Sequence, residues 1–61
     1  MPVITLEAAS LSKEQKQELT AEFTALAARI MNLPMASFYV FLKENALENV
    51  GVGGVLLSDI L

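Results

Sequence analysis

The sequence predicts a small α/β subunit built from one β-strand–α-helix–β-strand unit. Three segments carry this prediction. Residues 1–6 are apolar and rich in β-branched types, residues 13–31 place apolar side chains at helical spacing, and residues 37–43 are aromatic and β-branched without a helical period. A long helix between two strands forms a crossover, so we expect parallel strands and a right-handed connection. The 61 residues are expected to form a single domain over residues 1–61.

The composition predicts an obligate homo-oligomer. Hydrophobic residues make up 54% of the chain and the mean hydropathy is +0.52, values that exclude a disordered tail. A chain this short buries only about 60% of the surface that it exposes when unfolded, so small folds usually need an additional stabilising link. The sequence has neither cysteine nor histidine, which excludes disulfides and removes the usual ligands of structural zinc. Self-association is the link that remains.

Charge and hydropathy narrow the range of partners. Four basic and seven acidic residues give a net charge of −3 without a basic stripe, so we expect no nucleic acid partner. The most apolar stretches, residues 33–42 and 50–57, are short and interrupted by proline or glycine, so we expect no membrane partner. No signal peptide is recognisable, and a cytoplasmic location is expected.

The predicted helix has sequence signals at both ends. Ser12 and Gln15 fit a capping box at its start, which leaves residues 7–11 as a loop. Asn32 suits the left-handed conformation that ends a helix, and Pro34 prevents continuation. The apolar side chains fall on one stripe, formed by Leu19, Phe23, Leu26, Ala27 and Ile30.

After the helix, the second strand is expected at residues 37–43 and to be covered on both faces. Residues 44–49 form a polar connector. The Gly-rich segment at residues 51–54 predicts a turn with positive φ, and residues 55–61 form a short apolar tail. Two strands do not make a stable sheet alone, so partner subunits are expected to cover the apolar faces.

The usual catalytic constellations are absent from the sequence. Without histidine or cysteine there is no conventional triad and no thiolate nucleophile. Glu14, Glu18 and Glu22 recur at four-residue spacing off the apolar stripe, which predicts a solvated helix face. Lys13 and Lys16 are interpreted as solubilising surface residues.

Pro2, directly after Met1, is chemically unusual. Removal of Met1 converts its nitrogen from a non-basic amide into a secondary amine at the start of a strand. Burial in an apolar pocket disfavours the ammonium form and lowers the pKa of such an amine toward neutrality, so it could act as a general base. The alternative interpretation is that Pro2 only begins an edge strand.

Four features together resemble the 4-oxalocrotonate tautomerase family over nearly the whole chain. They are Pro2 opening the first strand, Ser12-x-Glu14-Gln15-Lys16 opening the helix, Pro34-x-x-Ser37 before the second strand, and Gly51-Val52-Gly53-Gly54 near the end. The resemblance implies a β–α–β subunit whose dimers form a four-stranded sheet covered by two helices. Three such dimers commonly form a hexamer.

The resemblance also implies a mechanism that uses no cofactor and no metal. The Pro2 amine takes a proton from an enol or 2-oxo acid and returns it at another atom of the same small molecule. Tyr39 and Val50 match pocket residues of the family, and Tyr39, Phe41 and Val50 are expected to line the pocket, partly from neighbouring subunits.

The sequence departs from the family at its charged positions. Members of the family carry one arginine in the loop before the helix and another in the second strand, where this chain has Leu11 (or Ser10) and Tyr39. Val50 replaces a bulky aromatic residue. These changes favour a neutral or monoacid substrate over a dicarboxylate. Tyr39 could donate its hydroxyl to a developing enolate oxygen, and Lys43, on the same strand face, is a candidate replacement cation.

The leading interpretation is therefore a cofactor-independent keto–enol tautomerase with Pro2 as general base. One alternative uses Pro2 as an acid in hydration or dehalogenation of an unsaturated acid. Another is a non-catalytic oligomer that binds an apolar ligand, which loss of both arginines favours and retention of Pro2 disfavours.

Overall fold

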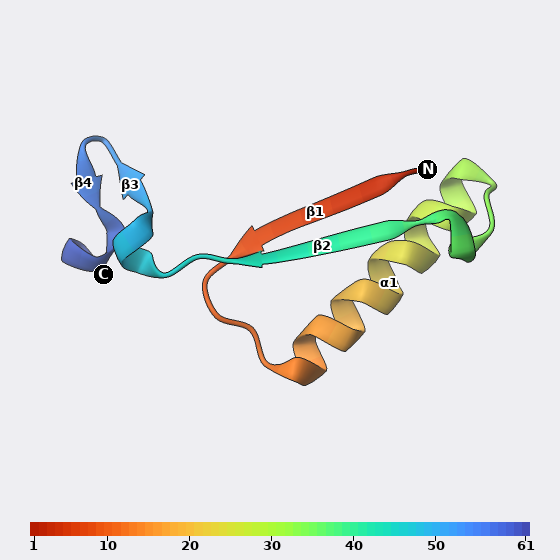
Figure 1. Ribbon diagram of the computed structural model, residues 1–61, viewed down its shortest axis with the longest axis horizontal. Helices are drawn as coiled ribbons and strands as arrows, with labels where there is room; N and C mark the ends of the chain where they lie inside the picture. Colours follow the sequence, from red (N-terminus) through yellow and green to blue (C-terminus); the bar gives the residue numbers. More distant parts are fainter.

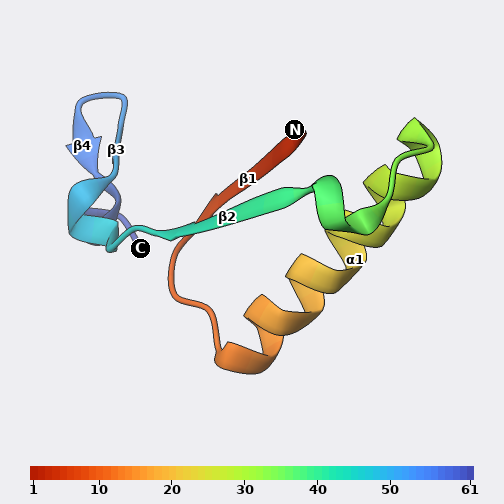
Figure 2. The same ribbon diagram turned by 45° about the vertical axis from the view of Figure 1, so that its right-hand side comes forward.

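Two parallel strands and one long helix form the β–α–β unit that the sequence predicts. The computed structural model describes all 61 residues, with β1 at Val3–Ala8, α1 at Lys13–Met31 and β2 at Tyr39–Glu44 (Figure 1). β1 and β2 pair in parallel over all six residues of each strand. α1 covers one face of this sheet and makes its main strand contacts with β2 (Figure 2). The α/β class and the strand direction are confirmed.

Both predicted helix ends are confirmed. The Ser12 hydroxyl accepts a hydrogen bond from the Gln15 N–H at 3.1 Å, and the Gln15 side-chain oxygen accepts one from the Ser12 N–H at 2.9 Å. At the other end Asn32 has φ 56° and ψ 49°, the left-handed conformation. The Ala28 carbonyl accepts hydrogen bonds from the Asn32 N–H and, at 3.1 Å, from the Leu33 N–H, and these two bonds close the end of the helix.

The first strand ends two residues later than expected. The sequence was interpreted as a strand over residues 1–6 followed by a loop, but Glu7 and Ala8 continue the ladder opposite Lys43 and Glu44. That expectation was wrong because it followed apolar composition. Glu7 can be part of the strand because its side chain lies on the exposed face of the sheet, where a charged group stays in water.

The second strand begins two residues later than expected. The chain first makes a 3₁₀ turn at Met35–Ser37, closed by the Phe38 N–H donating to the Met35 carbonyl at 3.1 Å. β2 begins at Tyr39, whose N–H donates to the Pro2 carbonyl at 3.1 Å. Pairing with β1, rather than the aromatic composition, sets where the strand starts.

The C-terminal residues form a hairpin that stands apart from the β–α–β unit (Figure 1). β3 at Gly51–Val52 pairs with β4 at Val55–Leu56 in antiparallel fashion. Gly53 and Gly54 connect them with φ of 60° and 85°, which confirms the predicted positive-φ turn. The polar connector and the tail each contain a 3₁₀ turn, at Leu47–Asn49 and Leu57–Asp59.

A single subunit has almost no buried core. Only Thr24 and Ala28, on the side of α1 that meets the sheet, are buried. The accessible surface is 4665 Å², whereas a folded monomer of this mass exposes about 3,900 Å². The radius of gyration is 14.8 Å, against about 10.5 Å for a compact chain of this length. The isolated subunit is therefore more extended than a compact monomer of this length and exposes more surface to solvent.

The second strand is covered on one face only within the subunit. Val40 and Leu42 point toward α1 and are half-buried, whereas Tyr39 and Phe41 point away and remain 52% and 49% exposed. The expectation of cover on both faces is thus not met by the chain alone. A one-helix subunit has no element left to cover the outer face.

The apolar stripe of α1 is also left uncovered in part. Leu26 and Ile30 remain 50% and 67% exposed because the small residues Thr24 and Ala28 occupy the side nearest the sheet. The stripe flanks β1 instead and encloses an entirely apolar hollow of about 330 Å³, lined by Ile4, Phe23, Leu26, Ala27, Ile30 and Met31.

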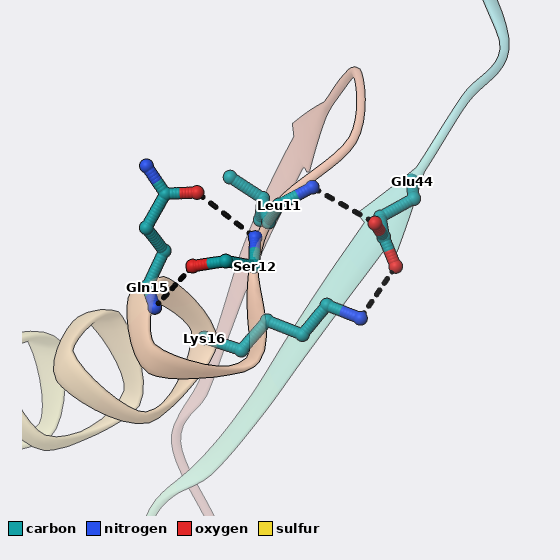
Figure 3. A network of polar contacts seen from close by, with 5 residues as sticks. All are labelled: Leu11, Ser12, Gln15, Lys16 and Glu44. Carbon is teal, nitrogen blue, oxygen red and sulfur yellow. Dashed lines mark hydrogen bonds and ion pairs between the residues drawn. The ribbon is translucent and has the colours of Figure 1, made fainter.

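A polar network ties the loop before α1 to the end of β2 (Figure 3). One oxygen of Glu44 accepts a hydrogen bond from the Leu11 N–H at 2.9 Å, and the other lies 2.6 Å from the Lys16 ammonium. The Lys16 side chain, and then the Leu11 N–H, hold the pKa of the Glu44 carboxyl below its ordinary value. The interpretation of Lys16 as a purely solubilising residue was wrong.

This network should give the protein an acid-sensitive contribution to stability. The folded-state pKa of Glu44 is lowered, so the contribution is present above the unfolded pKa of about 4.3 and is lost as pH falls through the folded value. Chemical denaturation across about pH 3 to pH 6 should show a shallower acid loss for Glu44→Gln than for wild type. Glu48→Gln, which removes an exposed carboxylate outside the network, is the matched control. Parallel curves for wild type and Glu44→Gln would contradict the assignment.

Candidate active site

Pro2 lies at the start of β1, at the same end of the subunit as the C-terminal end of α1 (Figures 1 and 2). Its carbonyl is held by the Tyr39 N–H, and the residue is half-buried. Strand alternation places its ring on the helix-covered face with Ile4, whose hollow also includes Met31. Pro2 is not part of the lining of that hollow, but its side of the sheet carries the apolar side chain of Ile4. While Met1 is attached, the Pro2 nitrogen is an amide and has no basic lone pair.

Tyr39, Phe41 and Lys43 share the outer face of the sheet. Their side chains alternate with the half-buried Val40 and Leu42 along β2. Tyr39 is next to Pro2 along the ladder, but the two side chains leave the sheet on opposite faces. One subunit therefore does not bring the Tyr39 hydroxyl and the Pro2 ring together on one surface.

Val50 lies in the largest depression, which is at the opposite end of the sheet from Pro2. The depression has a volume of about 580 Å³ between the end of β1 and the C-terminal hairpin. Its apolar wall includes Ala8, Val50 and Leu57, and its polar groups are Glu7, Asn45 and Asn49. The Asn45 side-chain amide donates to the Glu7 carboxylate at 3.1 Å, which fixes one side of the opening.

Leu11 is at this same far end. It lines a smaller hollow of about 300 Å³ with Gln15, Glu18, Leu19 and Glu22 at the start of α1. Six residues of β1 span about 17 Å at 3.3 Å per residue, so Leu11 and Val50 are remote from Pro2 within one chain. The structure thus divides the predicted site residues between the two ends of the sheet.

The exposed side of α1 carries a row of acidic side chains. Glu14, Glu18 and Glu22 are exposed on α1, as the sequence predicts.

No cluster of side chains in the structure is suited to hold a metal ion. No helix combines the length and hydropathy needed to cross a membrane.

The role of Glu44 was not predicted, because the residue was expected in the polar connector. Parallel pairing places Glu44 opposite Ala8 at the last step of the ladder, where it reaches the loop that contains Leu11. The available signal was the alternation of β2, which puts Glu44 on the helix-covered face with Val40 and Leu42.

The family model described as "Tautomerase enzyme" matches residues 2–60 of this chain. A protein named "Probable tautomerase" from Listeria monocytogenes serotype 4b (strain F2365) is 34% identical over 61 residues, covering 98% of this chain and all of the relative. A relative with the same description from Listeria innocua serovar 6a is also 34% identical over 61 residues, with the same coverage.

Solved structures share the fold closely. DmpI from Archaeoglobus fulgidus is 33% identical with a TM-score of 0.86, covering 95% of this chain and 100% of that chain. A 4-oxalocrotonate tautomerase homologue is 32% identical with a TM-score of 0.87, covering 97% and 95%. A structure described as a heterohexamer 4-oxalocrotonate tautomerase from Chloroflexus aurantiacus J-10-fl is 28% identical with a TM-score of 0.78, covering 98% and 95%. With the family model matching almost the whole length of this β–α–β chain, the protein belongs to the tautomerase family.

Proposed function

We propose that this protein is a cofactor-independent keto–enol tautomerase in which the amine of Pro2, exposed by removal of Met1, is the general base. The observation that carries the proposal is the position of Pro2. It is the second residue of a tautomerase-family chain and is fixed at the start of β1 by the hydrogen bond from the Tyr39 N–H. The proposed substrate is a small enol or 2-oxo acid, and a neutral molecule or a monoacid is favoured over a dicarboxylate.

The surroundings of Pro2 favour a neutral amine. Ile4 and Met31 provide apolar surface on its side of the sheet, and the structure places no ion pair there. Desolvation penalises the ammonium form and lowers the pKa of an amine. The neutral amine accepts the enol proton and, as an ammonium, returns it to carbon, so the amine is regenerated and no electrons are transferred to a cofactor.

Tyr39, Phe41 and Val50 are proposed as pocket residues and Leu11 as part of the pocket rim. Tyr39 carries a hydroxyl that could donate to the oxygen on which negative charge develops. Because Leu11 and Val50 lie at the other end of their own sheet, the proposal requires that they come from a different subunit than Pro2. Lys43 is the remaining proposed cation of the outer sheet face.

Self-association is part of the proposal. The subunit leaves two separate apolar surfaces uncovered, the outer sheet face with Tyr39 and Phe41 and the helix flank with Leu26 and Ile30. A two-fold interface buries the same surface patch on both partners. Covering two separate patches therefore requires two different interfaces between subunits. Dimers that associate further into a hexamer meet this requirement. The Chloroflexus relative described as a heterohexamer supports it.

A second candidate function is a non-catalytic oligomer that binds an apolar ligand. The observation that favours it is the absence of a cationic side chain at both Leu11 and Tyr39, where the family resemblance implies arginines. In that case Met1 would remain attached and Pro2 would serve only to begin the edge strand.

Replacement of Pro2 by alanine tests the general base. Intact mass of protein from its native source should first show that Met1 is absent. Ketonisation of an aryl enol-pyruvate should then fall by about a hundredfold or more in Pro2→Ala, the usual contribution of a positioned base. In wild type, kcat/KM should depend on a group that titrates below the range of about 7.7–8.0 of an ordinary terminal amine.

Pro34→Ala is the matched control, because Pro34 is the other proline of the chain and lies in the turn before β2. It should retain wild-type turnover. Equal rates in wild type and Pro2→Ala, with circular dichroism showing both folded, would remove Pro2 from the mechanism. A native mass that includes Met1 would support the non-catalytic candidate.

The proposed assembly can be tested at Phe41. Phe41→Glu places a charge on the outer sheet face and should shift sedimentation velocity toward a smaller species, because burying an unpaired carboxylate is strongly unfavourable. Gln17→Glu introduces the same residue on the exposed side of α1 and should leave the wild-type species unchanged. A stable folded 6.6 kDa monomer in the wild-type sample would contradict the assembly.

A further inference from the structure

The hollow beside Leu11 carries two carboxylates that have no cationic partner. Glu18 and Glu22 line it together with Leu11, Gln15 and Leu19. Both glutamates are exposed, and neither takes part in an ion pair. Any ligand group that reaches Leu11 therefore meets an apolar side chain backed by negative charge.

Lys16 is already engaged in an ion pair at the loop that contains Leu11. The Lys16 ammonium lies 2.6 Å from one oxygen of Glu44, whose other oxygen holds the Leu11 N–H (Figure 3). The Glu44 carboxylate therefore balances the positive charge of Lys16. A ligand carboxylate that recruited Lys16 would have to displace Glu44 and release the loop that Glu44 positions.

The depression around Val50 has the same character. Glu7 is the one charged side chain in its lining. Lys43 is the ladder partner of Glu7 and lies outside the linings of both hollows. Both hollows that contain predicted pocket residues are thus edged by carboxylates, and no lysine or arginine lines either one.

We propose that the active site selects an uncharged enol or carbonyl substrate, and that Glu18 and Glu22 set this preference by repelling a substrate carboxylate. This inference rests on the proposed function, because Leu11 and Val50 must face the Pro2 of another subunit. A carboxylate entering either hollow would lose hydration without gaining a cation from its lining, and like charges at short range oppose it further. An ester, ketone or aldehyde incurs neither cost.

The test compares two substrates of matched shape, the enols of phenylpyruvate and of its methyl ester, with the full-length protein after Met1 removal. Wild type should show the larger kcat/KM for the ester. The double variant Glu18→Gln/Glu22→Gln should raise kcat/KM for the acid by about two- to fivefold per charge removed, the range of an exposed charge interaction, and leave the ester unchanged. Added salt should narrow the difference between acid and ester in wild type.

Glu14→Gln is the matched control, because Glu14 carries the same charge on the same helix and lines neither hollow. It should change the acid-to-ester ratio much less than the double variant does. Preference for the acid in wild type, an unchanged ratio in the double variant, or loss of acid turnover in Lys43→Gln would each overturn the inference.

A binding measurement separates this inference from the proposed function. Cinnamate and methyl cinnamate are titrated into wild type and the double variant and followed by NMR. Tighter binding of the ester, with a gain for cinnamate alone in the double variant, is the expected result. Equal affinities or tighter cinnamate binding in wild type would overturn the inference, whether or not turnover depends on Pro2. Turnover that is independent of Pro2 would instead overturn the proposed function.

Discussion

Parallel pairing of β1 and β2 determines how the rest of this protein is organised. Because a helix crosses between the strands, both strands start at one end of the sheet and finish at the other. Pro2 and Tyr39 therefore lie at the first end, and Leu11 and Val50 lie at the second. No rearrangement within 61 residues can join these ends while the ladder persists, so a site that combines them has to be built from more than one copy.

The same architecture explains the missing core. One helix can cover one face of two strands, and here the small residues Thr24 and Ala28 make that contact. The larger apolar residues of α1, such as Ile30, then lie beside β1 rather than over the sheet. Apolar surface that would form the centre of a larger domain therefore stays on the outside, and in the proposed assembly the contacts that cover this surface also complete the site.

Local signals in the sequence predicted the local structure well. The Ser12 capping box, the Asn32 helix end and the positive-φ turn at Gly53 each depend on a few neighbouring residues, and all three were predictable. The ends of the strands were harder to predict, because pairing with the distant strand β2 extends β1 through Glu7 and Ala8. The link from Glu44 to Leu11 spans 33 positions in sequence, and only the folded register brings the two together. The proposed convergence of the site residues could not be predicted for the same reason, since the proposal places it at contacts between chains.

The two contacts that position the candidate site both use backbone atoms. The Pro2 carbonyl is held by the N–H of Tyr39, and the loop is held through the N–H of Leu11. Neither contact depends on which side chain occupies position 11 or 39. Under the proposed function, the Pro2 amine can thus keep its place whether positions 11 and 39 carry the arginines that the family resemblance implies or the leucine and tyrosine of this chain. The proposal therefore separates proton transfer from recognition of substrate charge. In that proposal, the side chains at positions 11 and 39 affect which molecule enters the site rather than where the base lies.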